Sequence, residues 1–194
     1  MSIPSRTQAA AIMRGVGPSG RLLTHCSVVG EIAAFLCAAM ARRGAAVDIP
    51  LTESAAFLHD LDKALPKDDP LRELGHGPAG AEWLRRNGNA ELGEAVANHP
   101  VGTLGGADGY EEWAARLSLE ARVVAFADKR ALQDVVTLDE RFARWYRKYP
   151  ESEMLLVAHE RARLLERDIC AAAGIEPHEV QRLPWVEAAL REAA

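Results

Sequence analysis

The chain has 194 residues, of which 48% are hydrophobic and 26% are charged, and its formal net charge is −5 at pH 7. This length is enough to bury a hydrophobic core without disulfides, and we expect one domain over residues 1–194. The acidic balance argues against a broad basic surface, so we expect neither a nucleic acid polymer nor a membrane as a partner. A local basic cluster for a small phosphorylated ligand is compatible with this composition.

The three cysteines, Cys26, Cys37 and Cys170, each lie in an apolar stretch with helical spacing. An odd number without a short paired spacing indicates structural thiols in a reducing compartment. The first residues do not show a basic segment followed by a continuous apolar one, which is the pattern of a signal peptide. The longest apolar stretches are interrupted by Arg, Glu or Gly, so we expect no transmembrane helix and a cytoplasmic protein.

The N-terminal part of the chain predicts two helices separated by a loop. A short helix over residues 4–14 precedes a segment rich in glycine, and Ser19 is a suitable N-cap for the next helix. From residue 21 to about residue 43, apolar residues recur at alternating steps of four and three, which is typical of an amphipathic helix. Gly44 ends this helix, and His25 lies at the margin of its buried face.

The stretch 55–65 places two polar side chains at the end of an apolar helix. Thr52 is the expected N-cap of this helix, which we expect to continue to about Lys63. His59 and Asp60 directly follow a run of apolar residues. A buried carboxylate is costly unless it is paired, hydrogen-bonded or bound to a metal, so Asp60 requires a partner.

Two further histidines stand at expected helix ends. His76 lies in a glycine-rich segment just before Pro78, and proline suits the first turn of a helix. His99 follows a short helix over residues 90–98, which Pro100 prevents from continuing. The segment 101–110 contains four glycines and predicts a mobile loop or lid.

The last third of the chain also has helical periodicity. Ser118 is the expected N-cap of a helix that leads to Asp128, and residues 131–147 are expected to continue as helix with a break near Asp139. C-terminal helices are expected over about residues 150–193, with a stop at Gly174 and a new start near Pro184. Because no segment alternates with the period of a strand, the predicted fold class is all-α.

The polar residues at these helix ends are of metal-binding types. Four of the six histidines and two aspartates occupy such positions, namely His25, His59, His76, His99, Asp60 and Asp128. Imidazole together with carboxylate suits a mid-row divalent ion, whereas a structural zinc site more often uses cysteine. We therefore expect one or two divalent metal ions, with Fe, Mn or Mg as the candidates.

The order His25, then His59-Asp60, then Asp128 resembles the motif of the HD-domain metal-dependent phosphohydrolases. The resemblance covers roughly residues 20–135 and includes Lys63 after the His-Asp pair and the sequence around His76. It implies an HD-domain helical bundle, to which the helices after about residue 150 form a C-terminal extension. A lone His-Asp pair is a weak signal, but the ordered set is a specific one.

The resemblance also implies a role for each residue of the set. One metal ion is expected at His25, His59, Asp60 and Asp128, and Asp60 is expected to bridge to a second ion at His76 and His99. Such a centre activates a water that attacks phosphorus, so the implied activity is hydrolysis of a phosphate ester or phosphoanhydride. The expected substrate is a small phosphorylated molecule, with a nucleotide as the favoured class.

Several residues are candidates for catalysis or substrate binding beside the metal. Lys63 lies one helical turn after Asp60 and Arg21 one turn before His25, so both can present positive charge to a phosphate. For Lys63 the competing interpretation is an ion pair with an aspartate. Arg130 is a further candidate, although it could equally lie on a solvated face. An alternative to metal binding for His76 and His99 is direct contact with a substrate phosphate.

The sequence leaves the substrate open and allows two alternative functions. Relatives that split diadenosine tetraphosphate carry other residues where this chain has Pro100 and the run 129–131, so that substrate is only one option. A regulatory HD module that binds a nucleotide without turning it over is a second hypothesis. An HD-type di-iron oxygenase is a third, because it uses similar ligands. A homodimer is compatible with the sequence.

Overall fold

The computed structural model describes residues 3–194, which form helices and contain no β-strand. This confirms the all-α class. The helices are α1 (Arg6–Gly15), α2 (Gly20–Arg42), α3 (Ile49–Leu58), α4 (Pro78–Arg86), α5 (Gly93–Asn98), α6 (Val101–Leu104), α7 (Tyr110–Ala115), α8 (Leu119–Lys129), α9 (Leu138–Lys148), α10 (Glu153–Ala173) and α11 (Val186–Glu192), with the 3-10 turns η1 (Leu61–Ala64), η2 (Pro70–Leu74), η3 (Ala90–Leu92) and η4 (Pro177–Glu179).

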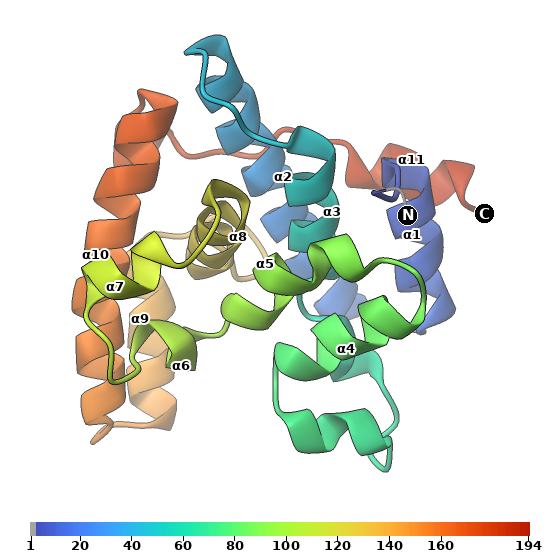
Figure 1. Cartoon of the computed structure of the whole chain (residues 1–194), viewed down its shortest axis with the longest axis horizontal. Coiled ribbons are helices and arrows are strands. Elements are labelled where there is room, and N and C mark those ends of the chain that lie inside the picture. Colours follow the sequence, from blue (N-terminus) through green and yellow to red (C-terminus); the bar gives the residue numbers. More distant parts are fainter. Residues whose placement is uncertain (1–2) are drawn as a thin grey trace.

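Helix α2 lies in the middle of the molecule and packs against α3, α8 and α10 (Figure 1). Its N-cap is Ser19, as predicted, and the Ser19 hydroxyl accepts a hydrogen bond from the Leu22 amide at 3.2 Å. By length and composition α2 could cross a membrane, but 67% of its most apolar window is buried among the other helices. Packing in the core therefore accounts for its apolar composition.

A close approach between α2 and α3 brings His25 and His59 to the same place. Gly30 of α2 faces Phe57 of α3, and a Cβ atom at position 30 would lie 3.1 Å from the Phe57 Cβ. This spacing is tighter than ordinary van der Waals contact, so a side chain at position 30 would require the two helices to shift by a few tenths of an ångström. The sequence did not reveal this role.

The prediction for the start and end of α3 was wrong by several residues. Asp48, not Thr52, is the N-cap, and its side chain accepts a hydrogen bond from the Leu51 amide at 3.0 Å. The Thr52 hydroxyl instead donates to the Asp48 carbonyl inside the helix. The α-helix ends at Leu58 and continues as η1, so His59 and Asp60 lie at a change of helical geometry that turns both side chains toward the same cluster.

Two other segments differ from their predicted structure. Residues 101–110 are partly helical, with α6 at their start and the beginning of α7 at their end. Residues 131–137 are not helical; Ala131 forms an isolated bridge with Val135, and Thr137 caps α9. The Thr137 hydroxyl and the Glu140 side chain form a reciprocal capping box, a signal that the sequence contains and that was overlooked.

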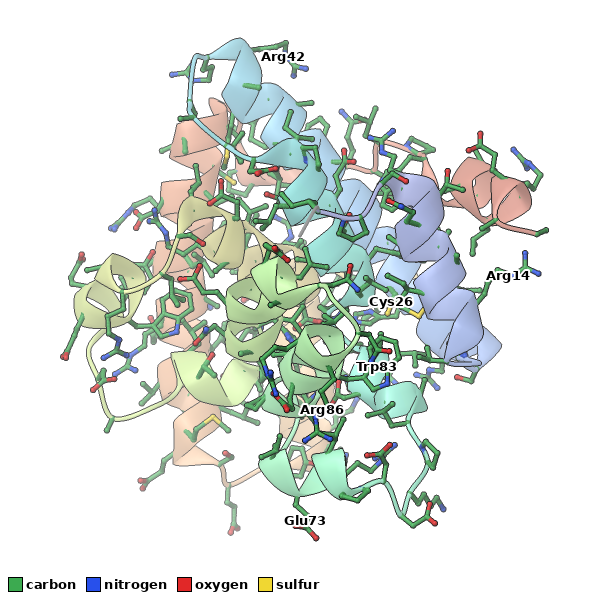
Figure 2. All side chains as sticks on the ribbon, turned by 45° about the vertical axis from the view of Figure 1, so that its right-hand side comes forward. Arg14, Cys26, Arg42, Glu73, Trp83 and Arg86 are labelled. Carbon is green, nitrogen blue, oxygen red and sulfur yellow. The ribbon has the colours of Figure 1, made fainter. Side chains whose placement is uncertain are left out.

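The C-terminal part returns to the N-terminal part of the chain. Helix α11 packs against α1, and Figure 1 shows the two ends of the chain near each other. Figure 2 shows Arg42 and Glu73 directed outward at opposite extremes of the molecule, whereas Cys26 lies among the helices and is fully buried. The buried apolar residues of all these regions form one continuous cluster.

A buried carboxylate fastens the C-terminal segment to α2. Glu31 is 3% exposed, and its side chain accepts hydrogen bonds from Arg182 Nε at 2.7 Å and from the amide of Trp185 at 3.2 Å. The backbone carbonyl of Glu31 accepts a further bond from the Leu183 amide. The connection that leads into α11 is therefore held by one charged side chain of the central helix.

We expect Glu31→Ala to lower the free energy of unfolding by about 2–3 kcal/mol, because charged hydrogen bonds to buried amides are lost. Urea denaturation followed by circular dichroism measures the change. The matched control is Glu187→Ala, which removes an exposed ion pair with Arg191 and should cost less than about 0.5 kcal/mol. Equal effects of the two substitutions would contradict the anchoring role of Glu31.

Candidate metal centre

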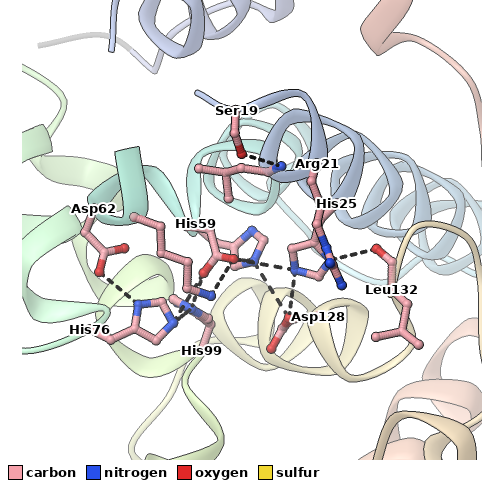
Figure 3. A network of polar contacts seen from close by, with 12 residues as sticks. Ser19, Arg21, His25, His59, Asp62, His76, His99, Asp128 and Leu132 are labelled. Atoms are coloured by element: carbon pink, nitrogen blue, oxygen red, sulfur yellow. Dashed lines mark hydrogen bonds and ion pairs between the residues drawn. The ribbon is translucent and has the colours of Figure 1, made fainter. Parts of the chain in front are cut away.

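The six sequence-predicted ligands lie together although they come from separate parts of the chain (Figure 3). Each is positioned by the start, the end or the buried face of a helix: His25 on α2, His59 and Asp60 after α3, His76 before α4, His99 after α5, and Asp128 on α8. The helix ends that the sequence predicted at His76 and His99 therefore bring these side chains to the same cluster as the His-Asp pair.

All four histidines are oriented in the same way. In each imidazole ring, Nδ1 is hydrogen-bonded away from the centre to an acceptor, so Nδ1 carries the proton and Nε2 has a free lone pair when the ring is neutral. The contacts are His25 with the Leu132 carbonyl (3.0 Å), His59 with the Ala56 carbonyl (2.7 Å), His99 with the Val96 carbonyl (2.6 Å) and His76 with Asp62 Oδ2 (2.9 Å). This is the arrangement of metal-binding histidines, whose second nitrogen is fixed by an acceptor.

The first group of ligand atoms lies on one side of Asp60. His25 Nε2 is 3.6 Å from Asp60 Oδ2 and 3.2 Å from Asp128 Oδ1. His59 Nε2 is 3.5 Å from Asp60 Oδ2 and 3.7 Å from Asp128 Oδ1. Two imidazole nitrogens and two carboxylate oxygens thus surround one small volume, in the numbers that a divalent ion uses.

The second group uses the other oxygen of Asp60. His76 Nε2 and His99 Nε2 lie 3.3 and 3.4 Å from Asp60 Oδ1, and the two nitrogens are 3.1 Å apart. When both rings are neutral with their proton on Nδ1, two lone pairs face each other across this short distance. A cation between them would remove the repulsion, and these three atoms are the ones that would hold it.

Burial makes the cluster expensive without a cation. His59, Asp60 and His99 are at most 1% exposed. His59 Nε2 and Asp60 Oδ1 have no hydrogen-bond donor among the described residues. A buried polar atom without a partner costs about 1–3 kcal/mol, so these atoms fit a ligand role and not a role in core packing.

The charge states of the cluster suit a positive ion. Burial opposes the ionisation of Asp60, but His59, His99 and Lys63 outweigh it and hold the pKa of Asp60 well below its usual range. Burial lowers the pKa of His99 to about 4, against the opposing effect of Asp60, so this ring is neutral at pH 7. An ionised carboxylate and a neutral imidazole are the forms that bind metals.

Asp128 is ionised for a similar reason and is also tied to His99. Burial disfavours its charged form, but Lys129 and Arg141 outweigh burial and keep the pKa of Asp128 well below its usual range. Lys129 is fully buried; its Nζ donates to Asp128 Oδ2 at 3.1 Å and to the backbone carbonyl of His99. Lys129 therefore connects one residue of each group, and burial lowers the pKa of Lys129 against the effect of Asp128.

Two side-chain cations already lie against the ligand oxygens. Lys63 Nζ is 2.7 Å from Asp60 Oδ2, and Arg141 Nη2 is 3.0 Å from Asp128 Oδ1. The ion pair weighed for Lys63 in the sequence is thus present with Asp60, while its side chain remains 47% exposed beside the cluster. Arg141 was missed, because it lies on α9, beyond the motif.

A pocket of about 330 Å³ opens directly onto this cluster. Arg21 lines it, as expected, together with His25, Asp60 and Lys63, and Figure 3 shows Arg21 beside His25. Arg141 and Arg144 from α9 line the same pocket, which the sequence did not indicate. The spacing of three residues that places both arginines on one face of a helix was the available signal. Two of the six candidate ligands, His25 and Asp60, thus border a cavity that is also lined by four positively charged side chains.

Arg130 does not face this pocket, which corrects its expected role in substrate binding. The side chain is 4% exposed and points toward the C-terminal part of the chain. Its guanidinium pairs with Glu166 at 2.7 Å and donates to the carbonyls of Val136 and Pro177. All of these contacts are structural, and neither a substrate-binding role nor a solvated face describes this residue.

The comparisons with known proteins agree with this geometry. A model of the HD domain family matches residues 22–132, which is more than half of the chain. The match includes all six residues of the cluster and ends before α9. Neither a search of curated proteins nor a search of solved structures found a match.

We expect the chain to bind two divalent ions when it is purified with Mn²⁺, because each oxygen of Asp60 faces a separate set of lone pairs. His76→Ala should remove one ion and Asp60→Ala both. Inductively coupled plasma mass spectrometry after gel filtration measures the content. The control is His178→Ala, an exposed histidine outside the cluster, which should not change it. Wild-type protein that retains no metal would contradict the ligand assignment.

Proposed function

Because the chain belongs to the HD domain family, most of whose members are metal-dependent hydrolases, we propose that it is a metal-dependent phosphohydrolase of a small phosphorylated molecule. A nucleotide is the favoured substrate class. The bond that is broken is a phosphate ester or a phosphoanhydride, and water is the nucleophile.

One observation carries this proposal. Six side chains direct ligand atoms at two small volumes on either side of Asp60, and two of the six, His25 and Asp60, line a cationic pocket. Ligand atoms alone would suit a structural metal. The pocket supports a catalytic one, because the ions would be accessible to a ligand and the surrounding arginines favour an anionic one.

The residues around the cluster have different roles toward a bound phosphate. Asp60 belongs to both groups of ligand atoms, since its Oδ2 faces His59 and its Oδ1 faces His99. Divalent ions at these positions, with Fe, Mn and Mg as candidates, supply charge neutralisation at the phosphoryl oxygens and a water of lowered pKa. Lys63 has a half-exposed side chain whose ammonium lies beside Asp60. Burial opposes its charged form, but Asp60 and Asp128 outweigh burial and raise the pKa of Lys63. It therefore remains charged and can stabilise negative charge on the leaving group.

Arg21, Arg141 and Arg144 add fixed positive charge to the walls of the pocket. Arginine can bind a phosphate through two parallel hydrogen bonds, which fixes the orientation of the phosphate as well as its position. Arg141 is also held by Trp145, over whose ring its guanidinium lies at 4.3 Å from the centroid. Orientation of the phosphorus atom relative to the water is a major part of catalysis in such reactions.

We expect Asp60→Asn and removal of metal by a chelator each to lower kcat/KM by more than about 100-fold, because both remove the electrostatic stabilisation of the transition state. The assay follows phosphate release from p-nitrophenyl phosphate and from a panel of nucleotides with Mn²⁺, Fe²⁺ or Mg²⁺. Readdition of the metal should restore the wild-type protein but not the variant. His178→Ala is the matched control and should leave the rate unchanged.

The alternatives predict other results in the same experiment. Tight binding of a nucleotide to the metal-loaded protein, with no product under any of the three metals, would favour a regulatory module. Consumption of O₂ with an organic substrate, and loss of activity without air, would favour a di-iron oxygenase. Either result would contradict the phosphohydrolase proposal.

A further inference from the structure

A second cavity, of about 840 Å³, continues from the metal centre along α9. Lys63 and His76 line it at the end near the cluster, and Arg141 and Arg144 line both this groove and the smaller pocket. The two cavities therefore share a wall. Arg147 and Lys148 line the groove farther along α9. The groove is larger than a single phosphate needs, and its volume is in the range of small-molecule binding sites.

Lys63 and Arg141 at the inner end of this groove are paired with Asp60 and Asp128, but the three basic residues farther along α9 have no acidic partner. Arg144, Arg147 and Lys148 are exposed, and none of them forms an ion pair within residues 3–194. None of the residues that line the groove is acidic. Four cations on one eleven-residue helix are a strong local excess in a chain whose net charge is −5.

Simpler explanations account for only part of this pattern. Cations in the last turn of a helix interact favourably with its dipole, which covers Arg147 and Lys148. Arg144 lies in the middle of α9 and has no such reason. The acidic residues at the start of α9 have partners elsewhere: Asp139 contacts His159 and Arg163, and Glu140 forms the capping box with Thr137. The positive charge that faces the groove therefore has no acidic partner on α9 and is available to a ligand.

The groove is also lined by apolar and aromatic residues. Trp145 of α9, Tyr149 directly after α9, and Met154 and Leu155 of α10 line it, and Tyr149 and Met154 are 48% and 40% exposed. A ligand that fits this lining carries anionic groups together with an apolar or aromatic part. A molecule with a single phosphate would leave the distal cations unpaired while that phosphate is at the metal centre.

We propose that the α9 groove binds a second phosphate group of the substrate, so that the preferred substrate carries at least two phosphates. This inference rests on the proposed function for its assignment of the first phosphate to the metal centre. The reaction needs no further reactant. Water forms a new P–O bond, the P–O bond to the leaving group breaks, and a proton from the water goes to the leaving oxygen or to solvent.

The test is a binding measurement with two probes that differ by one phosphate. Calorimetry compares AMP with α,β-methylene-ADP, which resists hydrolysis at the bond between its phosphates, on Mn²⁺-loaded wild-type protein. We expect the second probe to bind at least about tenfold more tightly, since one charge-assisted contact contributes about that factor. In Arg147→Gln/Lys148→Gln, which changes only residues that line the groove and not the pocket at the metal centre, this advantage should fall below about twofold, while the affinity for AMP stays within about twofold.

The control is Arg42→Gln, which removes one positive charge from the distant end of α2 (Figure 2). It lies seventeen residues from His25 on the same helix, which corresponds to roughly 25 Å. It should leave both affinities unchanged. Equal binding of the two probes to wild-type protein, or a preference that survives the double substitution, would overturn the inference.

Failure of the proposed function gives a different result from failure of the inference. If the wild-type protein binds α,β-methylene-ADP through Arg147 and Lys148 but hydrolyses no phosphate compound, the groove is confirmed and the enzymatic proposal is wrong. If it hydrolyses p-nitrophenyl phosphate but shows no preference for the second phosphate, the enzymatic proposal stands and the groove is an ordinary solvated surface.

Discussion

The four imidazole rings around Asp60 impose the constraint on which the rest of this structure depends. Each ring has its Nδ1 hydrogen-bonded outward, so four Nε2 atoms, which offer lone pairs when the rings are neutral, and two ionised carboxylates converge in a largely buried space. Such atoms repel one another unless a cation lies among them. The ends of α3 and α5, the start of α4 and the face of α2 all serve to hold these lone pairs in place.

The supporting residues fix the ligands with little freedom. Carbonyl groups at or beside helix ends accept the Nδ1 protons of His59 and His99, so the end of each helix sets the orientation of its own histidine. Lys129 joins Asp128 to the backbone at His99 from a fully buried position. Gly30 allows α2 and α3 to approach closely enough for His25 and His59 to share a site. Fixed orientation of this kind is what raises the affinity of a metal site.

The sequence predicted the parts of this arrangement that depend on local signals. Helix periodicity, glycine and proline placed three of the histidines at helix ends and His25 at the margin of a buried helix face, and the order of ligand types indicated the family. Asp48 was missed as the cap of α3 although aspartate is a stronger N-cap than threonine by residue type. The role of Arg130 was not predicted, because a run of charged residues does not reveal which side chains are exposed. In the structure Arg130 is buried by its ion pair with Glu166, which is distant in the sequence.

The contribution of α9 lies outside the family motif and could not be predicted from it. The family match ends at residue 132, yet Arg141 contacts Asp128 and Arg144 lines the pocket. Residues far along the chain thus complete the site from a separate helix. Variation in such a segment can change which phosphorylated molecule is bound while the metal ligands stay the same.

Anomalous diffraction from a crystal soaked in Mn²⁺ tests the central claim most directly. The account predicts two peaks, one among His25, His59 and Asp128 and one between His76 and His99, with Asp60 between them. A single peak would limit the account to one ion. The absence of any peak, with Lys63 and Arg141 still paired to the two aspartates, would show that the cluster is a buried ion-pair network and would contradict the account.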